Sequence, residues 1–106
     1  MRPRIVVSNR GDVLLFDSEQ AAESYLEPAD VRNEEYMAYD TEGRLLSLRV
    51  EGNKVQIVAA DLMPQHQDDL RVVLESFLMR VGDLTQEHRR LSLPQLAELI
   101  LKHKTT

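Results

Sequence analysis

The chain has 106 residues, 42% of them hydrophobic and 29% charged, which fits one globular domain with a single core. It contains no cysteine, which excludes disulfides, thiolate metal sites and cysteine nucleophiles. The net charge of −5 argues against general nucleic-acid binding, which requires a basic face, so we expect no nucleic-acid partner.

The amino-terminal residues carry positive charge as an export signal does, in Met1-Arg2-Pro3-Arg4. The apolar run that follows, at 5–7, is far too short for such a signal, and no window approaches the roughly 18 apolar residues of a membrane span. We therefore expect a cytoplasmic protein with no membrane partner.

Two short runs rich in β-forming residues, 5–7 and 13–16, flank a turn-rich connection at 8–12 and predict a hairpin. A helix is expected next, beginning at Asp17, which forms a capping box with Gln20, or at Ser18, which fits that box less well. Pro28 disfavours helical geometry in the residue before it, so this helix should last about three turns. Its buried stripe would contain Ala21, Ala22, Tyr25 and Leu26.

Residues 34–60 predict two further hairpins joined end to end. The first turns at Asp40-Thr41-Glu42-Gly43 and the second at Gly52-Asn53. Side chains alternate along the strands, and the apolar set would lie on one face: Leu46, Leu48, Val50, Val55, Ile57 and Ala59. The alternation predicts an antiparallel sheet with one buried and one solvated face.

Two helices should complete the chain. Pro64 marks the start of the first and Gly82 its end, and its apolar positions are Leu70, Val73, Leu74, Phe77, Leu78 and Val81. The second begins near Ser92 with Gln95 as its capping-box partner, and buries Leu96, Leu99 and Ile100. Between them, one helical turn is expected near Thr85. The order ββαβββαα predicts an α+β domain: an antiparallel sheet of about five strands with helices packed on it.

The sequence shows few signs of catalysis. It has no glycine-rich phosphate loop and no GxSxG elbow for a serine nucleophile. His66-Gln67-Asp68-Asp69 could bind a cation, but acids at this position more simply oppose a helix dipole. A small acid-pair enzyme remains an alternative, although the aromatic-lined cleft of such enzymes is not expected in a chain without tryptophan. We expect no enzyme, no metal and no cofactor.

The net charge is concentrated at 17–42, where nine acids face a single base, Arg32. Clustered like charge destabilises a fold unless a partner of opposite charge offsets it. Glu19, Glu23 and Glu27 are four apart, so a helix places them on one face. The alternative is a solvated helix face with acidic loops, which describes most charge runs.

Two tyrosines accompany these acids. Tyr36 and Tyr39 are three apart in a predicted strand, so they point to opposite faces and at most one belongs to the core. The other would be an exposed anchor of the kind that interfaces favour. The predicted binding surface contains Glu19, Glu23, Glu27, Asp30, Glu34, Glu35, Tyr36, Tyr39, Asp40 and Glu42.

Three stretches in the first half of the chain resemble small immunity proteins of bacterial polymorphic toxin systems, including contact-dependent growth inhibition. They are Asn9-Arg10-Gly11-Asp12 through Phe16, Ala22-Glu23-Ser24-Tyr25-Leu26-Glu27-Pro28, and Glu35-Tyr36-Met37-Ala38-Tyr39-Asp40-Thr41-Glu42-Gly43-Arg44-Leu45-Leu46. The resemblance implies a cytoplasmic antitoxin that binds one cognate toxin domain, often a nuclease, in a one-to-one complex. Contact residues differ between such pairs, so none is assigned by the resemblance.

A basic nuclease would complement the acidic segment. The sequence therefore predicts a non-enzymatic inhibitor of a basic toxin domain. An adaptor or regulatory subunit that binds a protein through a sheet edge or the last helices is the alternative.

Overall fold

The computed structural model describes residues 4–9, 12–60 and 62–105, with the side chains of Ala59 and Thr105 left out. Within these residues the sheet has five strands, in the order β2-β1-β3-β4-β5, and every neighbouring pair is antiparallel. The strands are β1 (Ile5–Asn9), β2 (Asp12–Phe16), β3 (Tyr36–Asp40), β4 (Leu45–Glu51) and β5 (Lys54–Ala60). This confirms the predicted α+β fold. The link between β1 and β2, which was predicted to be a turn, lies partly outside the described residues.

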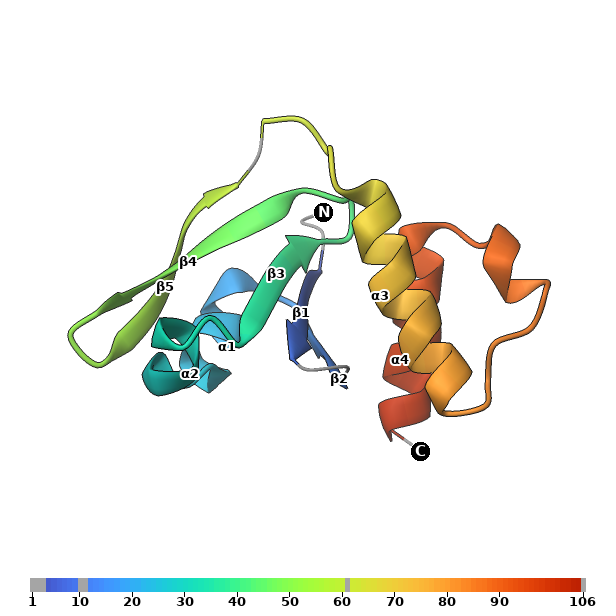
Figure 1. Ribbon diagram of the computed structural model, residues 1–106, viewed down its shortest axis with the longest axis horizontal. Helices are drawn as coiled ribbons and strands as arrows, with labels where there is room; N and C mark the ends of the chain where they lie inside the picture. The colour runs from blue at the N-terminus through green and yellow to red at the C-terminus, as the bar shows by residue number, and fades with distance from the viewer. Residues whose placement is uncertain (1–3, 10–11, 61, 106) are drawn as a thin grey trace.

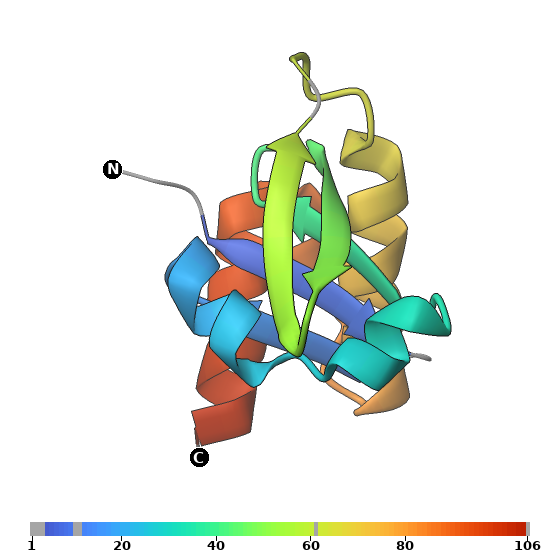
Figure 2. The ribbon, with the colours of Figure 1, turned by 90° about the vertical axis from the view of Figure 1, so that its left-hand side faces the viewer.

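Helices lie on both sides of the sheet. On one side lie α1 (Glu19–Tyr25) and α2 (Pro28–Arg32), and on the other α3 (Gln67–Arg80) and α4 (Leu93–Thr105), as Figure 1 shows. Turned by 90°, Figure 2 shows β4 and β5 crossing in front of β1 and β2, with α3 and α4 behind. Among the described residues, no helix has the length and apolar character to cross a membrane.

Alternate residues of β1 enter two separate cores. Val6 packs with the apolar faces of α3 and α4, whereas Ile5 and Val7 pack with α1 and with Leu46 of β4. The expectation of one solvated face, made for the strands within 34–60, is wrong for β3, where Ala38, Tyr39 and Asp40 are all buried. The continuous apolar run at 5–7 of β1 is likewise buried on both sides. The expectation is confirmed for β4, where Leu46 is buried while Ser47, Arg49 and Glu51 are exposed.

The first helix is shorter than predicted. Ser18 caps α1 by accepting a hydrogen bond from Ala21 N (3.1 Å), whereas Asp17 pairs with Arg4. The helix ends at Tyr25 after two turns. Tyr25 was expected in the core, but it is 61% exposed and its ring lies against Phe16 with centroids 5.4 Å apart.

The second helix, α2, was not predicted. Pro28 occupies its first turn, where the missing N–H of proline is tolerated, so the proline that was expected to end the first helix instead begins α2. This helix packs against β4 and β5. Helix α2, which belongs to the acidic stretch 17–42, therefore contacts the β4–β5 hairpin.

The last two helices agree with the sequence pattern. α3 begins at Gln67, three residues after Pro64, and Gly82 follows its end with φ +77°, although Val81 is exposed. Ser92 and Gln95 form a reciprocal capping box at the start of α4, with N–H···O distances of 2.9 and 3.3 Å. Between the helices, His88–Arg90 form a 3₁₀ turn.

Candidate functional site: an acidic surface on α1 and α2

Three glutamates of the α1–α2 segment are exposed to solvent: Glu19, Glu27 and Glu34. Among the residues that the structure describes, none of the three forms an ion pair. The one base of the segment, Arg32, donates to the carbonyl of Gly52 (3.0 Å). These three glutamates, called here the acidic surface, are therefore exposed carboxylates that no cation of the described residues neutralises.

Two further acids of this segment have internal partners. The Glu23 carboxylate accepts a hydrogen bond from Ile57 N (2.7 Å), and Asp30 accepts one from the hydroxyl of Tyr36 (3.0 Å). Partial burial of Tyr36, together with this bond, raises the pKa of its phenol. Both acids and Tyr36 are half-buried, as is Glu35, so they border the acidic surface rather than form it.

Acids elsewhere in the molecule are mostly matched by cations. Lys104 pairs with Asp12 at 3.2 Å and thereby joins α4 to β2. The other acids outside 19–35 that pair with an arginine are Asp17, Asp40, Glu42, Glu51, Glu75 and Glu98. Asp68, Asp83 and Glu87 are the described acids outside 19–35 that form no ion pair.

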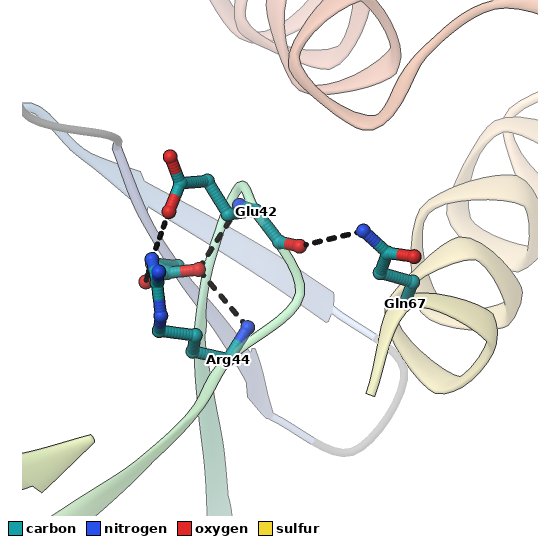
Figure 3. A network of polar contacts seen from close by, with 4 residues as sticks. Glu42, Arg44 and Gln67 are labelled. Atoms are coloured by element: carbon teal, nitrogen blue, oxygen red, sulfur yellow. Dashed lines mark hydrogen bonds and ion pairs between the residues drawn. The ribbon is translucent and has the colours of Figure 1, made fainter. Parts of the chain in front are cut away.

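The acids of the β3–β4 turn belong to a different part of the molecule. Asp40 is buried and accepts hydrogen bonds from the N–H groups of Glu42 and Arg44, both at 3.0 Å. The guanidinium of Arg44 pairs with the Glu42 carboxylate, as Figure 3 shows, and lies 3.5 Å from the Asp40 carboxylate. Gln67 Nε2 donates to the Glu42 carbonyl (3.1 Å), which attaches this turn to the start of α3.

The sequence-based surface is therefore corrected at two positions. Tyr39 is 4% exposed and Asp40 is 6% exposed, so neither can contact a partner, and burial raises the pKa of the Tyr39 phenol. Glu42 is exposed and stays a prediction, although it pairs with Arg44 and follows the end of β3, whereas Glu34 and Glu35 precede its start. Tyr36 and Tyr39 do lie on opposite faces of the sheet, as their spacing predicted.

An apolar groove of about 370 Å³ lies beside the acidic surface. The groove forms where β3 and β4 separate. These two strands pair only through Ala38–Leu46 and Tyr39–Leu45, and the rest of β4 pairs with β5 and diverges from β3 (Figure 1). Its walls come from α2, β3, β4 and the connection before β3: Val31, Glu34, Tyr36, Met37, Ala38, Leu45, Leu46 and Leu48. This groove was not predicted from the sequence, because alternation indicates the two faces of a strand but not where two strands separate.

A larger hollow of about 630 Å³ lies between the β3–β4 turn and the starts of α3 and α4. Its two arginines already have partners: Arg44 pairs with Asp40 and Glu42, and Arg71 donates to Glu75 and to the Leu91 carbonyl. The described residues contain no group of three potential metal ligands. His66, which the sequence offered as a ligand, lies 2.9 Å from Asp69 within the first turn of α3.

Comparisons with protein-family models, curated proteins and solved structures found no significant match to this chain.

Proposed function

We propose that this chain is a non-enzymatic inhibitor, an immunity protein that binds and neutralises one basic toxin domain in the cytoplasm. A nuclease is the expected class of toxin, because a nuclease needs positive charge around its active site to hold phosphates. The single observation that carries the proposal is the acidic surface. Glu19, Glu27 and Glu34 are exposed, and among the described residues none of them pairs with a cation.

The physical argument rests on complementary fields. Exposed carboxylates on α1 and α2 would lie where the nuclease otherwise holds the phosphates of its substrate. Such complementarity raises association rates by orders of magnitude at low salt, and the effect declines as ions screen the charges. The complex should therefore form with one-to-one stoichiometry and with an association rate that falls steeply as salt is added.

The test uses the carboxyl-terminal domain of the protein encoded directly upstream of this chain. Co-expression of this chain should abolish the toxicity of that domain in bacteria, and the two purified proteins should elute as a one-to-one complex. Continued toxicity, or the absence of a complex at micromolar concentrations, would overturn the proposal.

A pair of charge reversals tests the location of the contact. Glu27→Lys should lower the association rate roughly tenfold at low salt. Glu87→Lys makes the same change of net charge at an exposed acid in the carboxyl-terminal half, and it should have a much smaller effect. Equal effects of the two variants would show that only the net charge matters.

An adaptor that binds a partner through apolar contacts is the second candidate. It is favoured by the side chains around the end of β5, where Leu62 is 94% exposed, Met63 62% and Val58 48%. Large exposed apolar side chains close together in the chain are typical of protein contacts. Binding through this surface would be almost independent of salt and would be lost in Leu62→Ser.

A further inference from the structure

The short helix α2 ends in a hydrogen-bond pattern that normally requires glycine. The N–H of Glu34 donates to the Val31 carbonyl (3.1 Å) and the N–H of Glu35 to the Asp30 carbonyl (3.0 Å). This pair of bonds is the Schellman motif, and the residue after the helix cap adopts a left-handed conformation. That residue is Glu34, with φ +56°.

The same motif ends α3, which offers an internal comparison. There the N–H of Gly82 donates to the Met79 carbonyl (3.1 Å) and the N–H of Asp83 to the Leu78 carbonyl (2.8 Å). Glycine fills the left-handed position with φ +77°. A residue with a β-carbon in this conformation destabilises the fold relative to glycine. Glu34 therefore occupies a position at which its own side chain is unfavourable for folding.

Glu34 is also the one charged residue among those that line the apolar groove. The other walls include Val31 from α2, the half-exposed Met37 from β3 and Leu48 from β4. The ring of Tyr36 contributes an aromatic wall, and its orientation is fixed by the bond to Asp30. The groove thus combines apolar walls with a carboxylate that has no cation among the described residues.

We propose that this groove receives an arginine side chain of the basic partner, with Glu34 binding its guanidinium. The inference rests on the proposed function and names its central contact. Apolar walls suit the aliphatic stem of an arginine, and a carboxylate matches the planar fork of its guanidinium. Arginine also stacks on aromatic rings, whereas the compact and strongly hydrated ammonium of lysine gains less from such a site. Interfaces concentrate their binding energy in anchors of this kind.

The test is an NMR titration of the ¹⁵N-labelled protein with the blocked tripeptide Ac-Gly-Arg-Gly-NH₂. Amide signals of Glu34, Met37 and Leu48 should shift in a saturable manner. The lysine tripeptide, which carries the same charge, should bind several-fold more weakly. Shifts confined to Glu19 and Glu27, or equal affinities for the two peptides, would overturn the proposal, because both would indicate non-specific attraction to acids.

Two substitutions separate binding from folding. Glu34→Gln keeps the side chain in the left-handed conformation and should weaken binding of the arginine peptide roughly fivefold. Glu34→Gly should weaken it similarly while raising the midpoint of thermal unfolding by a few degrees, because glycine suits the conformation. Unchanged affinity for the arginine peptide in both variants would exclude Glu34 as its partner.

The upstream toxin domain distinguishes failure of this inference from failure of the proposed function. If the wild-type chain binds that domain and Glu34→Gln and Met37→Ala bind it as tightly, the arginine site is wrong while the inhibitor function stands. If the wild-type chain does not bind the domain, the proposed function itself fails. A tenfold or greater loss of affinity in Glu34→Gln, with the fold intact, would support both.

Discussion

The Glu23 carboxylate accepts a hydrogen bond from the backbone N–H of Ile57 at 2.7 Å, so a helix side chain takes the place of a missing strand. β5 is the last strand of the sheet, and an edge strand leaves backbone N–H groups without partners. Helix α1 packs along this strand and supplies the acceptor. Glu23 therefore has a structural role, although it shares a predicted helix face with Glu19 and Glu27.

This bond predicts different effects for two substitutions of Glu23. Glu23→Ala should lower the free energy of unfolding by about 1–2 kcal/mol, because the N–H of Ile57 loses its acceptor in a half-buried environment. Glu23→Gln retains an acceptor oxygen and should lose less. Urea unfolding measures both, with Glu27→Ala as the control, since Glu27 is exposed and makes no side-chain capping bond. If Glu23→Ala and Glu27→Ala are equally stable, the bond contributes nothing.

The β3–β4 turn predicts a large cost for adding one methyl group. Gly43 has φ +97°, and a β-carbon there would lie 2.4 Å from Gln67 Cγ and 2.9 Å from Gln67 Cα. Gly43→Ala should therefore destabilise the fold by about 2–4 kcal/mol, since both the conformation and the contact with α3 oppose it. Gly52 is the matched control: its φ is +62°, but no atom lies within 4 Å of the added carbon.

For Gly52→Ala we expect a loss of about 1 kcal/mol, from the backbone conformation alone. Thermal or urea unfolding of both variants measures the difference between them. Equal losses would mean that the turn yields to the added methyl group, and that its attachment to α3 is loose.

The carboxyl-terminal helices were predicted correctly from the sequence, because the local helix signals and the tertiary packing of their apolar faces agree there. The apolar spacing of Leu70, Leu74 and Leu78 matches the buried face of α3, and the Ser92–Gln95 box forms as predicted. Such elements depend on contacts within a few residues, which a pattern can capture.

The helices of the amino-terminal half were predicted less accurately, because tertiary packing determines where they begin and end. The apolar stripe of α1 included Tyr25, yet the helix ends at that residue, and Ala22 and Leu26 supply the buried contacts instead. A proline can follow the end of one helix or occupy the first turn of another, and the structure shows that Pro28 occupies the first turn of α2.

The candidate site was predicted in part. The sequence located the excess charge, but it did not indicate that Glu34 is exposed whereas Asp40 is buried. Burial of an acid depends on hydrogen-bond and ion-pair partners that lie across a turn or far along the chain. Nor could it show that Glu34 adopts the left-handed conformation, since no glycine or asparagine marks the position.

Asp40 predicts a stability effect without an effect on binding. Its buried carboxylate accepts two backbone N–H groups and pairs with Arg44 at 3.5 Å. Asp40→Ala should lower the free energy of unfolding by about 2–4 kcal/mol, because the turn loses its acceptors and Arg44 loses a partner. Once folded, the variant should bind the upstream toxin domain with unchanged affinity per folded molecule. A loss of affinity with unchanged stability would return Asp40 to the binding surface.

The phenol of Tyr36 predicts a decline in stability at alkaline pH. Burial and the bond to Asp30 raise the pKa of Tyr36 above its ordinary value near 10, so the folded protein holds this proton more tightly than the unfolded chain does. The stability that follows from this shift is complete below about pH 10 and is lost as the pH rises through the higher pKa of the folded state.

Tyr36→Phe isolates this contribution. At pH 8 the variant should be less stable than the wild type by about 1 kcal/mol, since it lacks the bond to Asp30. As the pH rises above 10, the gap should close, because only the wild type has a phenolate to form at this site. Urea unfolding from pH 8 to 11 measures the gap, and absorbance at 295 nm follows tyrosinate formation. A gap that stays constant over this range would contradict the raised pKa of Tyr36 and, with it, the packing of that ring against α2.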